Sequence, residues 1–257
     1  MRTLITIVFI IAFSLTGSAQ AKVNQTDAKG QKQGIWIAKY PDGTLRYEGL
    51  FVDGKPVGEW KRYHENGKIK AIMLHGANSE RVEASLFDDE GVLYAKGIFA
   101  GTAKDSIWTY YNDKTIVGRE NYTNGKRNGQ SVTYFADGNI ARDTHYSNDQ
   151  VDGPWKEFFS SGAKKAELMF KDGQRNGWSI AYYENGQPQL EGKYTANQPD
   201  GEWTFFTEEG KEAFRLHYQQ GKLLNPEVAD SVQQKTFDAF DRMRGQLTEP
   251  TVPERFQ

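Results

Sequence analysis

A sequence repeat with a period of about 24 residues runs through most of this chain and constrains its fold more than any other feature. Tryptophans mark the repeat: Trp60 lies one period after Trp36, and Trp108, Trp155 and Trp203 then follow at intervals of two periods, of which the middle one is a residue short. The same register passes through Gly129 and Gly177 and through a degenerate unit at Val82. The chain therefore contains eight units between about residues 34 and 224, one of them a residue shorter than the others, and a partial unit precedes the first.

Each unit has the pattern of a β-hairpin. Its first strand corresponds to segments such as GEWKRYH and GPWKEFF, and a turn such as Asn66-Gly67 follows. Asn-Gly and Asp-Gly accept the positive φ angles that tight hairpin turns require. The second strand alternates with a period of two, which indicates one buried face. In the last unit that face receives Phe214, Leu216 and Tyr218.

A second turn, such as Asp172-Gly173, leads from each hairpin into the next. Sixteen strands spaced by about 4.8 Å would make a sheet on the order of 75 Å long. We therefore expect an all-β fold: an elongated antiparallel sheet or solenoid of about eight stacked 24-residue hairpins, twisted or curved, in which each unit is stabilised mainly by its neighbours. Irregular hairpins are expected at 75–85, which is polar, and at 112–118, where the fourth unit lacks its turn glycine.

The N-terminus has the three-part layout of a secretory signal peptide. Arg2 precedes the apolar run LITIVFIIAFSL, and the small residues of TGSAQA follow, with cleavage expected after Ala19 or Ala21. An apolar core of about 12 residues is too short for a spanning helix, which needs ~20. We expect residues 1–21 to be removed and the mature protein to be exported, periplasmic or extracellular, without a stable membrane span.

The C-terminus departs from the repeat. The array is expected to occupy residues 22–224, and Asn225-Pro226 then has the form of a helix N-cap followed by proline. Apolar residues recur at helical spacing from Val228 to Leu247. We expect an amphipathic helix over 225–248 that folds back over the last units and covers the open edge of the sheet, and then an irregular tail over 249–257.

Composition and motifs exclude several functions. The net charge is −2 and no basic stripe occurs, which argues against nucleic acid as a partner. The absence of cysteine excludes disulfides and a lipid-modified N-terminal cysteine. The chain has no HExxH, no GxSxG and no phosphate-binding loop, and its four histidines lack metal-ligand spacing. We therefore expect no catalytic residues, no metal and no cofactor.

Aromatic side chains make up 13% of the chain and fall into two rows. Tryptophan at the third position of a unit and tyrosine or phenylalanine at the sixth have opposite parity in a regular strand, so either both faces carry aromatics or a bulge reunites the rows. The rows are either stacking ladders within the sheet or an exposed surface that binds a partner. The candidate binding residues are Trp36, Trp60, Trp108, Trp155, Trp203, Tyr63, Tyr111, Tyr134, Phe158, Tyr182 and Phe206, and Phe87 occupies the same sixth position.

The motif G-x-W-x-x-[YF]-x-x-[ND]-G followed by Y-x-x-G resembles the MORN repeat, in its bacterial variant form. The best matches are GEWKRYHENG (58–67), GPWKEFFSSG (153–162), GWSIAYYENG (177–186) and GEWTFFTEEG (201–210), and the resemblance covers about three quarters of the chain. Ala84 and Ser131 depart from it where tryptophan is usual. The resemblance implies an extended sheet of hairpins that serves as a binding or assembly surface. Some bacterial relatives are grouped as antitoxin-like proteins.

The sequence thus predicts a non-enzymatic, exported repeat protein that acts as a binding or scaffold surface for another protein. Two alternatives are an antitoxin-like or immunity inhibitor, and a protein that binds cell-wall glycan through its aromatic rows.

Overall fold

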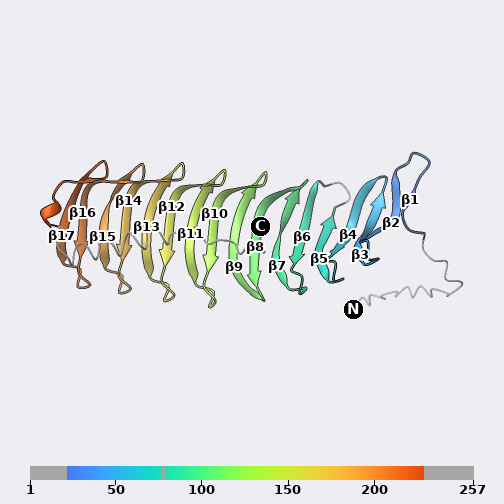
Figure 1. Cartoon of the computed structure of the whole chain (residues 1–257), viewed down its shortest axis with the longest axis horizontal. Helices are drawn as coiled ribbons and strands as arrows, with labels where there is room; N and C mark the ends of the chain where they lie inside the picture. The colour runs from blue at the N-terminus through green and yellow to red at the C-terminus, as the bar shows by residue number, and fades with distance from the viewer. Residues whose placement is uncertain (1–21, 77–78, 229–257) are drawn as a thin grey trace, which may run out of the picture.

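The computed structural model describes residues 22–76 and 79–228. In this part the chain forms one antiparallel sheet of 18 strands that lie side by side along the long axis of the molecule, as Figure 1 shows. Each strand pairs with the strand before it and the strand after it in the chain. The first nine are β1 Gln25–Thr26, β2 Lys32–Lys39, β3 Leu45–Val52, β4 Lys55–Tyr63, β5 Ile69–His75, β6 Arg81–Phe87, β7 Leu93–Ala100, β8 Ala103–Asn112 and β9 Thr115–Thr123.

The second half of the sheet continues the same pattern to the last described residues. Its strands are β10 Lys126–Tyr134, β11 Ile140–Ser147, β12 Gln150–Phe158, β13 Lys164–Lys171, β14 Gln174–Tyr182, β15 Pro188–Thr195, β16 Gln198–Phe206, β17 Glu212–Gln219 and β18 Lys222–Leu223. Strands β2 to β17 are the eight predicted hairpins, so the prediction of a long antiparallel all-β sheet is confirmed.

Two kinds of turn alternate along the sheet. The turn between β3 and β4 has two residues, Asp53 and Gly54, with φ angles of 49° and 74°, which is the geometry that favours Asp-Gly. The turn within a hairpin is longer: between β2 and β3 the Tyr40 amide donates to the Thr44 carbonyl at 2.8 Å, and the Gly43 amide donates back to Tyr40 at 2.9 Å. Short turns therefore line one long edge and five-residue turns line the other.

The two places where irregular hairpins were expected do differ from the rest. Five residues, 76–80, connect β5 to β6 where two are usual, and 77–78 lie outside the described residues. The fourth hairpin turns at Asp113-Lys114 in two residues, because strand pairing continues to Asn112 and Thr115. This tighter turn accounts for the shorter unit.

One face of the sheet, which we call the inner face, carries the third-position residues and their cross-strand neighbours. On β6 and β14 the third-position residues are Ala84 and Ser179, and they lie opposite Met73 and Leu168. Where the third residue is tryptophan, the neighbour on the preceding strand is small. A Cβ atom on Gly49, Gly97 or Gly192 would come within 2.2 Å of the indole of Trp60, Trp108 or Trp203, respectively.

From Trp60 on, the third-position residue therefore alternates between tryptophan and a small residue with a period of two units, whereas Trp36 precedes Trp60 by a single unit. The pairs of preceding-strand residue and third-position residue are Gly49/Trp60, Met73/Ala84, Gly97/Trp108, Glu120/Ser131, Thr144/Trp155, Leu168/Ser179 and Gly192/Trp203. Ala84 and Ser131, which stand where the repeat motif usually has tryptophan, thus belong to a regular pattern in which every second unit has a small residue at this position.

Backbone hydrogen bonds hold the indoles in place. The Nε1 atoms of Trp60, Trp108 and Trp203 each donate at 3.1 Å to the carbonyl oxygen one residue after the glycine. The indole N–H therefore has an acceptor in all three pairs, which offsets the cost of burying it at Trp108 and Trp203.

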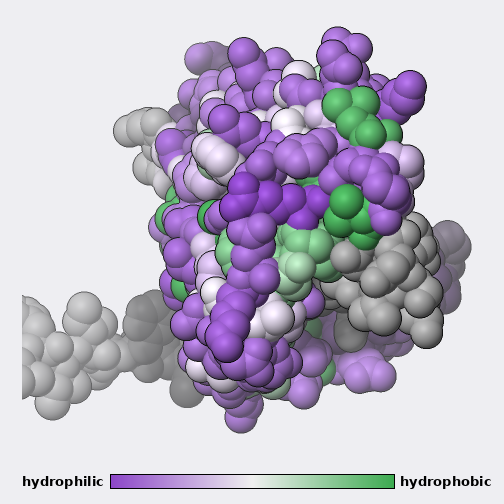
Figure 2. Space-filling model, turned by 90° about the vertical axis from the view of Figure 1, so that its left-hand side faces the viewer, coloured by the Kyte–Doolittle hydropathy of each residue, from purple (hydrophilic) through white to green (hydrophobic). Residues whose placement is uncertain are grey.

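Asparagine side chains protect both open edges of the sheet. At the first edge the Ile37 amide donates to Asn24 Oδ1 at 2.8 Å. At the last edge the His217 amide donates to Asn225 Oδ1 at 2.8 Å, and Asn225 Nδ2 donates to the Arg215 carbonyl at 3.1 Å. Figure 2 looks onto this last edge, whose surface is mainly hydrophilic. Unpaired strand groups invite strand addition, and these contacts reduce their number.

The expected helix over 225–248 is not present where the structure can test it. Residues Pro226–Val228 form a single 3₁₀ turn, and Asn225, which we expected to cap a helix, instead caps β17. The rest of the expected helix and the tail over 249–257 lie outside the described residues, as does the expected signal peptide over 1–21. Within the described part there is no α-helix.

Candidate binding surface

The two aromatic rows lie on opposite faces of the sheet. The Tyr63 hydroxyl donates to Glu48 Oε1. Glu48 pairs across the strands with Lys61, which alternates with Trp60, so Tyr63 and Trp60 point to opposite sides. Tyr182 repeats this contact with Glu167 at 3.1 Å. We call this second side the outer face.

A register shift does occur beside the sixth position of every unit, but it leaves the rows apart. In the second unit Arg62 pairs with Ala71 and Tyr63 with Ile69, so the extra residue, Lys70, is on the second strand. The bulge therefore changes the facing of the second strand and not of Tyr63. Of the two arrangements that the sequence left open, the structure has aromatics on both faces.

The predicted binding residues differ in exposure according to their face. On the inner face Trp108 and Trp203 are 0% and 2% exposed, Trp155 is also buried, and Trp36 and Trp60 are half-buried. These indoles pack against neighbouring strands and rings, for example Trp203 against Tyr194 with centroids 4.9 Å apart. The sixth-position residues on the outer face are all half-buried: Tyr63, Phe87, Tyr111, Tyr134, Phe158, Tyr182 and Phe206.

Exposed apolar side chains concentrate in one row of the outer face. The row crosses the strands at the second position of each unit, and cross-strand pairs such as Ile35–Leu50 and Pro154–Met169 belong to it. Polar residues interrupt the row on several strands: Glu59, Glu83, Asn121, Gln130, His145, Lys193, Glu202 and His217. Six of the nine exposed large apolar residues of the described chain lie in this row, which we call the outer stripe: Ile35, Leu50, Leu74, Ile107, Met169 and Trp178.

Trp178 is the most exposed member of the outer stripe, at 56%. It follows Gly177, whose φ of 117° belongs to a bulge on β14 that faces Met169. The ring of Trp178 pairs on its other side with Lys193, whose Nζ is 4.3 Å from the ring centroid. Trp178 is not among the binding residues predicted from the sequence. Its position, one residue before the third position of its unit, nevertheless indicates the face opposite the other tryptophans.

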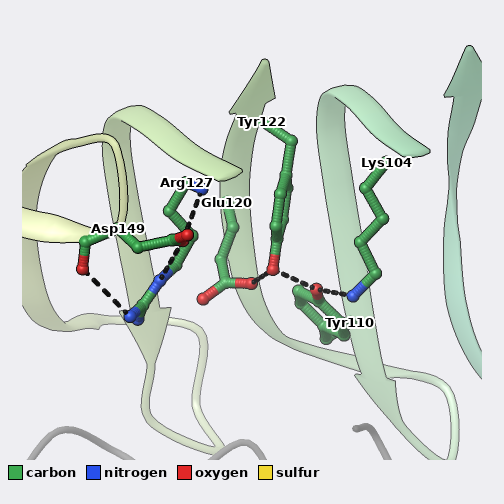
Figure 3. Close-up of polar contacts among 6 residues, drawn as sticks. All are labelled: Lys104, Tyr110, Glu120, Tyr122, Arg127 and Asp149. Carbon is green, nitrogen blue, oxygen red and sulfur yellow. Dashed lines mark hydrogen bonds and ion pairs between the residues drawn. The ribbon is translucent and has the colours of Figure 1, made fainter. Parts of the chain in front are cut away.

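A polar cluster on the inner face connects β8 and β9 (Figure 3). Lys104 Nζ donates to the Tyr110 hydroxyl at 3.0 Å, which lies 3.2 Å from the Tyr122 hydroxyl, and Tyr122 donates to Glu120 at 2.6 Å. Burial lowers the pKa of Lys104, an effect that the Glu120 carboxylate opposes, and burial raises the pKa of Tyr122. Beside it, Arg127 forms an ion pair with Asp149 at 3.6 Å.

This cluster is built for structure more than for chemistry. Glu120 is 7% exposed and takes the place that glycine, methionine or leucine has in other units of the inner row. Its carboxylate accepts from Tyr122 within a connected chain of donors and acceptors, so the buried charge is hydrogen-bonded as burial demands. The chain crosses two strands and helps to fix their register.

In the described part of the chain, no group of three or more His, Asp or Glu side chains is arranged to hold a metal ion. Across residues 22–76 and 79–228 no helix is long and apolar enough to cross a membrane.

The comparisons with known proteins agree with the repeat architecture. The family model described as MORN repeat variant matches residues 32–53, 56–75, 127–148 and 176–196. The chain therefore belongs to the MORN-repeat family. No curated protein matches it.

Solved structures give only distant likenesses. A crystal structure of TcdB2-TccC3-TEV matches with 11% identity over 76% of this chain and 12% of that chain, at a TM-score of 0.23. The Tc holotoxin pore of Photorhabdus luminescens matches with 11% identity over 77% of this chain and 13% of that chain, at a TM-score of 0.21. The chain thus spans about an eighth of these proteins, and scores this low carry no argument about function.

Proposed function

We propose that this protein is a non-enzymatic, exported binding protein whose outer face engages another protein. One observation carries the proposal: the exposed apolar side chains of the described chain concentrate in the outer stripe. Large exposed apolar groups gathered on one face are typical of interaction surfaces, because they gain free energy when a partner covers them. MORN repeats support the assignment to a repeat-protein binding surface.

The inner tryptophan row is a weaker candidate for the contact surface. Trp108, Trp155 and Trp203 are already buried, so a partner would gain little area from them. The half-buried aromatics of the outer face lie on the same side as the stripe and can extend the contact area. Glycan binding and an antitoxin-like role stay predictions, and no contact described above favours either.

The test is chemical crosslinking in cells that produce the protein, followed by purification and mass spectrometry. The variant Leu74→Asp/Ile107→Asp places two charges in the outer stripe, and Leu224→Asp is the matched control, because Leu224 is equally exposed but lies at the end of the array. We expect the stripe variant to lose a crosslinked protein that the wild type and the control retain. A crosslink pattern identical in all three would overturn the proposal.

Export is tested separately. Cell fractionation and the mass of the isolated protein should show an envelope or secreted form that begins after residue 19 or 21. A cytoplasmic protein that retains residues 1–21 would contradict this part of the proposal.

A further inference from the structure

A shallow hollow surrounds Trp178 on the outer face. Pro154, Met169 and Trp178 lie in one row on β12, β13 and β14, and Lys156, Glu167 and Ile180 form the neighbouring row. The hollow has a volume of about 210 Å³, is open to solvent and is mostly apolar. Its size suits a single large side chain better than a whole small molecule, since ligand pockets usually enclose several hundred Å³.

The exposed indole forms one wall of this hollow. Trp178 alone among the six tryptophans of the chain is exposed, and the bulge at Gly177 leaves its ring beside Met169. Tryptophan gives a large, rigid contact area, and at protein interfaces it is among the residues whose loss weakens binding most.

One cation beside the hollow, Lys193, can pair with an acidic partner. Lys156 and Lys164 both contact Glu167, at 3.8 and 3.1 Å, so this carboxylate is already paired twice. Lys193 covers the indole and forms no ion pair with any carboxylate of the described residues. Glu191 precedes it on the same strand face, and Asp200 pairs with it across β15 and β16 while accepting a hydrogen bond from the Gln220 amide at 3.1 Å. The Lys193 ammonium is therefore the group that an incoming carboxylate would meet first.

We propose that the hollow receives one large apolar side chain, such as leucine or phenylalanine, from an acidic segment of a partner protein, with a neighbouring carboxylate of that segment paired to Lys193. The proposal rests on the proposed function, since it assigns the anchor point of the same outer face. A sugar ring is the other occupant that an exposed indole can stack on, but a mostly apolar hollow offers few groups for its hydroxyls.

The experiment follows the indole N–H signals of ¹⁵N-labelled protein by NMR, with the Trp178 signal identified from its loss in Trp178→Phe. The probes are the peptides Asp-Asp-Leu-Asp-Asp, Asp-Asp-Ser-Asp-Asp and Lys-Lys-Leu-Lys-Lys, with blocked ends, and the sugar triacetylchitotriose. We expect only the acidic leucine peptide to shift the Trp178 signal in a saturable way. Lys193→Gln should weaken that binding about threefold to fivefold, as expected for one partly exposed ion pair. Lys55→Gln, at the start of the distant strand β4, is the matched control.

The outcomes separate cleanly. An equal response to the basic leucine peptide, no response to any peptide, or a response to the sugar alone would each overturn the inference. Failure of the proposed function has a different signature, because it would be seen in crosslinking with Leu74→Asp/Ile107→Asp. A protein that keeps its crosslinked partner in Trp178→Ala, but loses it in the stripe variant, would retain the proposed function without this anchor.

Discussion

The indole of Trp203 lies against the backbone of Gly192 so closely that a Cβ atom at residue 192 would come within 2.2 Å of the ring. Gly192 has no positive φ, so the contact with the ring, and not backbone conformation, excludes other residues. The same relationship joins two further pairs, and it explains why tryptophan and glycine occur together on this face.

Gly192→Ala should therefore destabilise the protein by at least about 2 kcal/mol, since overpacked cores typically lose 1–3 kcal/mol. Urea unfolding followed by circular dichroism measures the change. Gly118→Ala is the matched control, because Gly118 is also buried within a strand but its Cβ would meet nothing closer than 3.5 Å. In the double variant Gly192→Ala/Trp203→Ala the two losses should be less than additive. Equal effects of the two glycine substitutions would contradict the packing argument.

The alternation of large and small residues predicts a rescue between two units. Ser179 is fully buried opposite Leu168, so Ser179→Trp alone should destabilise the protein strongly. Adding Leu168→Gly reproduces the Gly/Trp pairing of the neighbouring units and should restore at least about 1 kcal/mol relative to Ser179→Trp. The free energies of unfolding of the four proteins in this cycle give the coupling. Zero coupling would show that the two sites pack independently.

Alkaline pH should destabilise the sheet through its outer tyrosines. Burial, followed by the hydrogen bond to Glu48, raises the pKa of Tyr63 to about 12. A phenol that keeps its proton in the folded state but loses it near pH 10 when unfolded contributes stability that is intact below pH 10 and is lost as the pH rises toward 12. Tyr63→Phe should flatten the decrease in unfolding free energy between pH 10 and 12. An absorbance titration at alkaline pH, in which Glu48→Gln lowers this pKa, is the second measurement.

Loss of the Glu120 carboxylate should destabilise the centre of the array. Glu120→Leu leaves the Tyr122 hydroxyl without this acceptor and the half-buried Lys104 ammonium without its nearby negative charge. Leaving a buried polar group unsatisfied costs about 1–3 kcal/mol, whereas replacing both partners by apolar residues costs far less. Lys104→Met/Glu120→Leu should therefore unfold at a higher urea concentration than Glu120→Leu. The opposite order would mean that the cluster does not act as a pair.

Removal of an edge asparagine should promote self-association. Asn225→Ala exposes the His217 amide and the Arg215 carbonyl, two hydrogen bonds that contribute about 0.5–1.5 kcal/mol each. Analytical ultracentrifugation should detect oligomers of this variant, because an open strand pairs with another chain. Asn176→Ala, at an exposed position inside β14, should remain monomeric. A monomeric Asn225→Ala would show that the edge is protected by other means.

Much of the fold was predictable from the sequence because each repeat is specified by short local patterns. Asp53-Gly54 and its equivalents specify the short turns, and alternation in strands such as Glu212–Gln219 specifies the buried face. The helix expected from Asn225 was not confirmed over the described residues, because the same amide that can cap a helix also satisfies a strand edge, and local pattern does not distinguish them.

The candidate site was less predictable, for two physical reasons. Burial depends on what lies across the sheet, so the sequence could not decide that Trp108 is fully buried while Trp178 is exposed. Facing also depends on bulges, and the extra residue at Lys70 follows from pairing between strands that no single strand reveals. The sequence did contain one signal: Trp178 lies one residue before the third position of its unit. Because successive residues of a strand point to opposite faces, this offset places Trp178 on the face opposite the other tryptophans.

The paired packing of the inner face also limits how such a chain can change its length. Deleting one hairpin between β5 and β8 would bring Met73 against Trp108, and duplicating one would set two small residues side by side and leave a void. From β4 onward, removing or adding two hairpins together keeps a small residue on the strand before every tryptophan. The first hairpin differs, because Trp36 precedes Trp60 by a single unit. The part of the array after β3 should therefore grow and shrink during evolution by pairs of hairpins.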